Sequence, residues 1–144
     1  MTAPKPTRPK TGRYFALWLI LAVAHLAITA VFMPPGTLAS GEPMLDIDYA
    51  LHFYQVQRAQ QAFAESGALW SWDPSHLAGY PAGAIEDMSV RGMQLFVIAA
   101  TKLGASVVSA YNLFIFLSVA VLPLLALLAA WLYRLDDRQG LVLG

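Results

Sequence analysis

Three side chains capable of metal binding or acid–base chemistry lie close together in one polar stretch: Asp46, Asp48 and His52. Two carboxylates that are two residues apart can turn toward one divalent cation, because such ions prefer oxygen ligands. Asp48 and His52 are four residues apart, so a helix beginning there places them on one face. The spacing predicts a site for Mg²⁺ or Mn²⁺ at these three residues, with Asp48 or Asp46 as a general base.

The same residues also have a purely structural interpretation. Asp48 precedes a helical segment and can cap it by accepting backbone N–H bonds. Asp46 is then a solvated loop charge, and His52 a surface residue. Because Asp-x-Asp is a common accident, the spacing alone leaves both interpretations open.

Two arginines in the same stretch can bind a phosphate. Arg58 and Arg91 are the cations of residues 34–92, and a guanidinium group matches a phosphate with two parallel hydrogen bonds. The alternatives are a solvated helix residue for Arg58, and for Arg91 an ion pair with Glu86 or Asp87 or a contact with lipid headgroups.

Aromatic residues follow in a segment rich in proline and glycine. Trp70, Trp72 and Tyr80 can stack on a sugar ring, and anchoring at a membrane interface explains them equally well. His76, beside Asp73 in a proline turn, is interpreted as structural. The density of helix and strand breakers predicts a loop without regular structure here.

The composition indicates the class of protein and the side of the membrane to which these residues belong. With 58% apolar and 12% charged residues, the chain is typical of membrane proteins. Basic residues crowd the first 13 positions, whereas residues 34–92 carry seven acids and two arginines, which predicts a cytoplasmic N-terminus and an external loop. The chain has no cysteine, which excludes disulfides, and the few basic residues of the tail do not indicate nucleic-acid binding.

An uncharged apolar run at residues 14–33 predicts the first transmembrane helix, after a disordered basic tail at residues 1–13. Pro34 and Pro35 end it. A cleavable signal peptide is the alternative, but the run is longer than the usual apolar region of about 7 to 15 residues. His25, near its middle, is either a proton or ligand site or a neutral imidazole bonded to a neighbouring helix.

Beyond it we expect an extracytoplasmic loop at residues 34–92, with an amphipathic helix at about 49–66. The apolar face of that helix is predicted from residues three and four apart, namely Tyr49, Phe53, Val56, Ala59 or Gln60, and Phe63, while Gln55, Gln57, Arg58, Gln61 and Glu65 point away.

Two further apolar segments complete the predicted topology. Residues 93–106 are too short to span and predict an interfacial or re-entrant helix. Residues 107–133 predict the second transmembrane helix, kinked at Pro123. Residues 134–144 are expected to form a cytoplasmic turn and the start of a further segment, which indicates the front piece of a longer protein. The predicted fold class is therefore all-α membrane: two transmembrane helices flanking an extracytoplasmic helical loop, both termini cytoplasmic.

The first loop presents, in order, Asp48, a helix, Gly67, Trp72-Asp73-Pro74 and Gly79-Tyr80-Pro81. This order resembles the N-terminal part of the GT-C superfamily of polytopic membrane glycosyltransferases, and within it the bacterial YfhO-like branch. The resemblance covers about residues 14–133. Its motifs are specific as an ordered set and weak one by one.

The resemblance implies a protein of the bacterial plasma (inner) membrane. It implies a polyprenyl-phosphate sugar as donor and inverting hexosyl or pentosyl transfer to an extracytoplasmic acceptor, with Asp48 or Asp46 as general base or metal ligand. Family members have many more spans than the two predicted here. The expected partners are therefore membrane lipid and the remaining transmembrane helices of a longer chain or of a partner subunit, without which this segment is inactive. The alternative function is a noncatalytic membrane assembly or interaction subunit.

Overall fold

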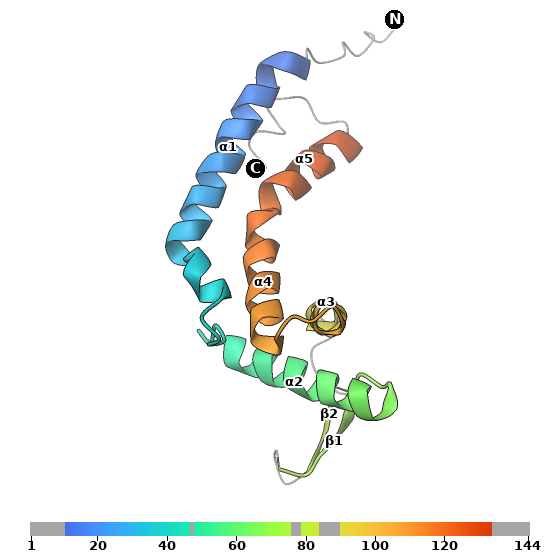
Figure 1. The fold of residues 1–144 in the computed structure, drawn as a ribbon. Helices are drawn as coiled ribbons and strands as arrows, with labels where there is room; N and C mark the ends of the chain where they lie inside the picture. The colour runs from blue at the N-terminus through green and yellow to red at the C-terminus, as the bar shows by residue number, and fades with distance from the viewer. Residues whose placement is uncertain (1–10, 47, 76–78, 84–89, 134–144) are drawn as a thin grey trace, which may run out of the picture. The chain divides into compact units, whose positions relative to one another are not determined.

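The computed structural model describes residues 11–46, 48–75, 79–83 and 90–133, and for residues 11–15 only the backbone. The described chain is mostly helical and divides into two units, the first formed by residues up to Met33 and from Leu117, the second by Pro34–Phe116. Figure 1 shows the elements, which are α1 Thr11–Phe32, η1 Pro35–Leu38, α2 Tyr49–Ser66, β1 Ser71–Asp73, β2 Tyr80–Ala82, α3 Arg91–Lys102, α4 Val107–Ala120 and α5 Leu122–Leu132.

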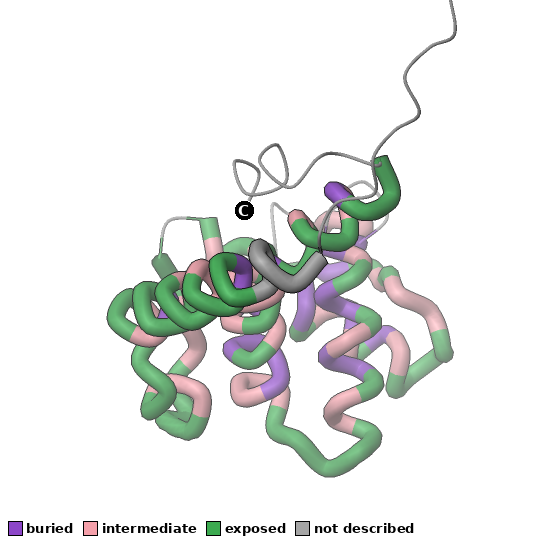
Figure 2. The backbone as a smooth tube through the Cα atoms, turned by 90° about the horizontal axis from the view of Figure 1, so that it is seen from above, coloured by how far each residue is buried: buried purple, intermediate pink, exposed green. Residues whose placement is uncertain are grey.

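The first unit pairs α1 with α5 and exposes most of its apolar side chains. Among the described side chains of α1, Trp18 and Thr29 alone are buried, and in α5 Pro123 and Ala130 are buried. In Figure 2 most of the backbone has the colours of exposed or half-buried residues. The large apolar side chains exposed here include Leu19, Ile20, Val23, Ile28, Val31, Phe32, Leu124, Leu125, Leu128 and Trp131.

His25 connects α1 to the end of α4. Its Nε2 lies 2.8 Å from the carbonyl oxygen of Val119. That carbonyl would normally accept from the N–H four residues on, but this position is Pro123, which has no N–H. Since a carbonyl only accepts, the imidazole carries a proton on Nε2 and donates it. His25 thus replaces the hydrogen bond that Pro123 removes, in agreement with the second interpretation, an imidazole bonded to a neighbouring helix.

This pairing predicts coupled stability effects. His25→Ala should cost about 0.6 to 2 kcal/mol, the range for hydrogen bonds between apolar helices. In a Pro123→Ala background the restored N–H can donate to the Val119 carbonyl, so His25→Ala should reduce stability clearly less. Reversible unfolding in mixed micelles measures the stability of the wild type, the two single variants and the double variant. If the stability losses of the single variants simply add in the double variant, His25 does not donate to the Val119 carbonyl.

Helix length and composition bear on the predicted crossings. Among the residues that the structure describes, no single helix is both long and apolar enough to cross a membrane alone. The α4 and α5 pair, joined at a short break, has the length and composition of one bent crossing, and Ala16–Phe32 is a shorter apolar helix. The two predicted transmembrane helices therefore stay a prediction.

In the second unit α2 packs against α3. α2 has the range predicted from its sequence pattern, and Gly67 ends it in the left-handed conformation at φ 74°. Its buried residues are Gln55, Val56, Ala59 and Ala62, and those of α3 are Met93, Gln94, Val97 and Ile98.

The buried face of α2 differs in part from the predicted one. Val56 and Ala59 are buried as expected, but Tyr49, Phe53 and Phe63 are only half-buried. The prediction that Gln55 points away was wrong. Small Ala59 and Ala62 let α3 approach closely, and Gln94 Nε2 donates to the Gln55 carbonyl, so this glutamine lies inside the contact.

The segment after α2 is a β-hairpin, so the prediction of a loop without regular structure was wrong. β1 and β2 pair antiparallel, with Trp72 opposite Pro81 and Asp73 opposite Tyr80. Gly79 makes the return possible, because its φ of 110° is strained for residues with a side chain. A Cβ on Gly79 would lie 2.5 Å from the Trp72 ring, so the indole rests against this glycine.

Candidate functional site

The two acids singled out by spacing lie at the start of α2, and both are exposed. Their backbone carbonyls begin the helix, with Tyr49 N donating to Asp46 O at 2.9 Å and Leu51 N donating to Asp48 O at 3.0 Å. Their carboxylates have no hydrogen-bond or ion-pair partner among the described residues. Asp48 occupies the N-cap position without a side-chain capping bond, since its backbone is already helical. The capping interpretation is therefore wrong, and both carboxylates are free to meet a ligand.

His52 does not join the acids in a metal site. It is half-buried, its Nδ1 lies 3.5 Å from Gln55 Oε1, and its ring is edge-on to Tyr49 at 6.2 Å. Within the described part of the chain, no three His, Asp or Glu side chains are grouped to hold a metal ion. Asp46, Asp48 and His52 do not form such a group as they lie, and a Mg²⁺ or Mn²⁺ ion at these residues stays a prediction.

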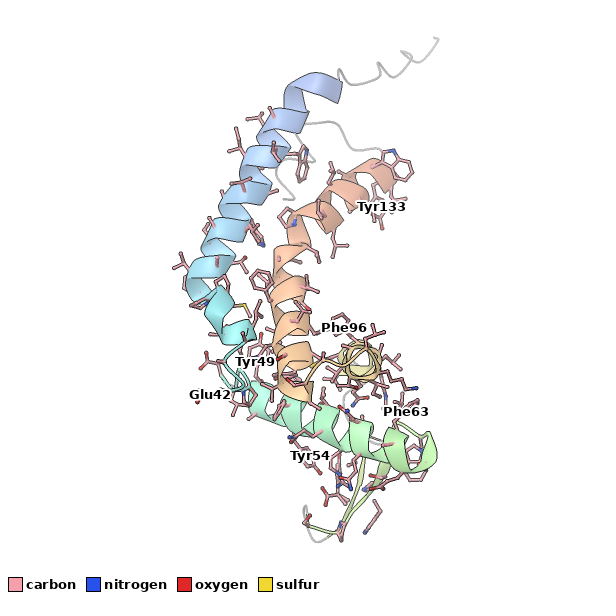
Figure 3. All side chains as sticks on the ribbon, in the orientation of Figure 1. Glu42, Tyr49, Tyr54, Phe63, Phe96 and Tyr133 are labelled. Carbon is pink, nitrogen blue, oxygen red and sulfur yellow. The ribbon has the colours of Figure 1, made fainter. Side chains whose placement is uncertain are left out.

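Tyr111 and Asn112 of α4 flank the acid segment, and the sequence analysis did not single them out. Both side chains are fully buried. Asn112 bonds three backbone groups, two carbonyls and one N–H, that precede Asp46, and the Tyr111 hydroxyl bonds the Tyr49 carbonyl, which follows Asp48. Figure 3 labels Glu42 and Tyr49, whose carbonyls accept from Asn112 and Tyr111. The available signal was an asparagine inside an apolar helix, which must find polar partners when buried.

A second group of polar residues, also missed, joins α2 to the hairpin around Asp73. Tyr54 OH donates to Asp73 Oδ2 at 2.7 Å, and the Ser75 N–H and hydroxyl donate to Oδ1 at 3.0 and 2.7 Å. Arg58 Nε lies 3.4 Å from Oδ2 and forms an ion pair. The Ser75 and Tyr54 hydrogen bonds lower the pKa of Asp73 from 3.8 to about 2, with a smaller contribution from the Arg58 charge. This acid is buried and fully engaged, so its role is structural.

Acid titration tests the role of Asp73. A carboxyl whose pKa is lower in the folded chain binds fewer protons there than in the unfolded chain. Its stabilisation should be complete above pH 3.8 and be lost as the pH falls toward 2. We expect Asp73→Asn to remove this part of the acid destabilisation, measured by circular dichroism, whereas Glu42→Gln, at an exposed acid, should retain it. If stability changes with pH equally in the wild type, Asp73→Asn and Glu42→Gln, Asp73 is not the source of this acid destabilisation.

The two arginines each have partners within the chain. Besides Asp73, Arg58 donates to Ser71 Oγ and the Trp72 carbonyl, both at 3.1 Å. Arg91 donates to the carbonyls of Leu69 and Gly83 and to Gln94 Oε1. Arg58 is therefore not the solvated helix residue of the alternative interpretation. Glu86 and Asp87, the predicted partners of Arg91, lie outside the described residues. Both guanidinium groups are thus engaged by groups of this chain, and phosphate binding by them stays a prediction.

The hairpin aromatics remain accessible. Trp70 and Trp72 are 55% and 59% exposed, and Tyr80 is half-buried. Trp72 lies within β1, and Trp70 directly precedes that strand. The Trp72 ring rests against Gly79, and its binding of a sugar ring or lipid headgroups stays a prediction.

Comparisons of this chain with protein-family models, curated proteins and solved structures found no match.

Proposed function

We propose that this chain is the membrane-bound N-terminal segment of a GT-C-like glycosyltransferase, which moves a hexose or pentose from a polyprenyl phosphate to an extracytoplasmic acceptor. One observation carries the proposal: Asp46 and Asp48 are exposed carboxylates without partners among the described residues. In contrast, Asp73 is buried and bonded, and Glu65 accepts a hydrogen bond from Gln61. The free acids are therefore the ones available to a substrate.

Membrane attachment is supported by the first unit. Helices α1 and α5 expose leucine, isoleucine, valine, phenylalanine and tryptophan side chains that would be costly in water. These apolar side chains can be buried by lipid and by further helices of a longer chain or of a partner subunit. The basic N-terminal tail favours a cytoplasmic N-terminus and an external position for the acidic loop in the bacterial inner membrane.

The proposed reaction uses Asp48 as the general base, with Asp46 beside it. The Asp48 carboxylate accepts the proton of an acceptor hydroxyl as its oxygen attacks the anomeric carbon of the sugar. The bond from that carbon to the phosphate oxygen breaks, and polyprenyl phosphate leaves with the electron pair. Because attack and departure occur on opposite faces, the anomeric configuration inverts.

Sugar transfer by membranes tests the proposal. Membranes of cells that express the full protein are supplied with polyprenyl phosphate carrying a radiolabelled hexose or pentose. Label should pass from the lipid fraction to an acceptor, and membranes without the protein should show no such transfer. If expression adds no transfer with any hexose or pentose donor, the enzymatic function is overturned and the noncatalytic assembly subunit is favoured.

A further inference from the structure

We propose that Tyr111 and Asn112 are positioning residues that hold the Asp46–Asp48 segment from its two ends. The inference rests on the proposed function for its catalytic consequence, but the clamp itself is a property of the second unit alone. Tyr111 and Asn112 are both fully buried in α4.

Asn112 holds the chain before the acids. Its Nδ2 donates to the carbonyls of Thr37 at 2.9 Å and Glu42 at 2.8 Å, and its Oδ1 accepts from Met44 N at 3.0 Å. An asparagine amide offers two N–H donors and one carbonyl oxygen, so both kinds of group are used. With 0% of its surface exposed, Asn112 has no access to water as a substitute. Its removal would leave three backbone groups without these bonds.

Tyr111 holds the chain after the acids. Its hydroxyl donates to the Tyr49 carbonyl at 2.7 Å, and its ring packs edge-on against Phe53 with the centroids 4.9 Å apart. Tyr49 is the first residue of α2 and follows Asp48 directly. The hydroxyl therefore fixes the first turn of α2 against α4.

Tyr111 and Asn112 are adjacent in α4 but bond to opposite sides of the two acids. Successive residues of an α-helix point about 100° apart, so neighbours reach different segments. Between the Met44 N–H and the Tyr49 carbonyl lie only residues 45–48, which contain both acids. Asp46 is two residues after the first of these groups and Asp48 one residue before the second, so the two bonds limit how far the backbone of each acid can move. Such fixation matters for a general base, since a displacement of about 1 Å can cost about 100-fold in rate.

Spin labelling tests the clamp without any substrate. The chain has no cysteine, so Leu45→Cys, at an exposed position beside the acids, takes a single nitroxide. Tyr111→Phe, which keeps the ring, and Asn112→Ala should each increase the mobility of this label, and the double variant should increase it most. A label at Gln57→Cys, exposed in α2, should not change. Leu113→Ala, at the exposed neighbour of Asn112, is the matched control.

Kinetics of sugar transfer in the full protein then separate positioning from binding. Tyr111→Phe and Asn112→Ala should lower kcat by about 10- to 100-fold with little change in KM. Unchanged label mobility at position 45 in both variants would overturn the clamp. Increased mobility with normal kcat would overturn its catalytic role. Increased mobility in a protein that shows no transfer in its wild-type form would leave the clamp established and count against the proposed function alone.

Discussion

Asp48→Asn is expected to lower sugar transfer by about 10²- to 10⁴-fold, the range that general acid–base catalysis contributes. Asparagine has nearly the same size, so the start of α2 should be kept, but its amide oxygen cannot take the proton of the acceptor hydroxyl. Because the Asp48 side chain makes no bond with the described chain, the substitution should leave the stability of the fold unchanged. Transfer from a labelled polyprenyl-phosphate sugar, measured together with membrane insertion, tests this expectation.

The neighbouring acids supply the controls for Asp48→Asn. Asp46→Asn should reduce transfer less if Asp48 is the base, and the reverse order would move the assignment to Asp46. Asp73→Asn should instead change acid stability through its lost ion pair with Arg58 and hydrogen bonds. Normal insertion and unchanged transfer in both the Asp46 and Asp48 variants would remove the catalytic assignment.

Gly83→Ala is expected to destabilise the second unit by about 3 kcal/mol or more, since it combines backbone strain with a clash. Gly83 has φ +83°, and a Cβ there would lie 2.6 Å from the backbone oxygen of Leu69. Backbone cannot rotate away as a side chain can. The Gly83 and Leu69 carbonyls also both accept from Arg91, so the clash would disturb the anchor of α3 as well.

Gly67→Ala separates the two causes. Gly67 has a similar φ of +74°, but nothing lies within 4 Å of its Cβ position. Alanine there should cost about 1 to 2 kcal/mol, the strain alone. Reversible denaturation followed by circular dichroism compares the two variants. Equal losses would show that the contact between Gly83 and Leu69 is not as close as described.

Local patterns in the sequence predicted α2 well. The apolar spacing and Gly67 predict a helix at about 49–66, and the structure has Tyr49–Ser66 with Gly67 as its left-handed end. These signals work because helix periodicity and a glycine terminus depend on residues close together in the chain. Likewise, Pro123 marks the break between α4 and α5, since the missing N–H is a property of that residue.

The parts that were missed depend on residues far apart in the chain. Asn112 is bonded to the carbonyls of Thr37 and Glu42, and Asp73 to Tyr54, pairings that no local spacing specifies. The hairpin was mistaken for an irregular loop because its prolines and glycines were counted as breakers. In the structure, Pro81 lies in a strand of a two-stranded sheet that pairs on one side only, so a missing N–H is tolerated, and Gly79 makes the return.

The proposed external position of the acidic loop can be measured directly by cysteine labelling. In a chain without native cysteine, Ser75→Cys and Thr7→Cys are treated in intact bacteria with a membrane-impermeant maleimide. We expect Ser75→Cys to be labelled in intact cells and Thr7→Cys to be labelled only after the membrane is opened. Labelling of Ser75→Cys only in opened cells would place the loop in the cytoplasm and contradict the proposed use of an external polyprenyl-phosphate donor.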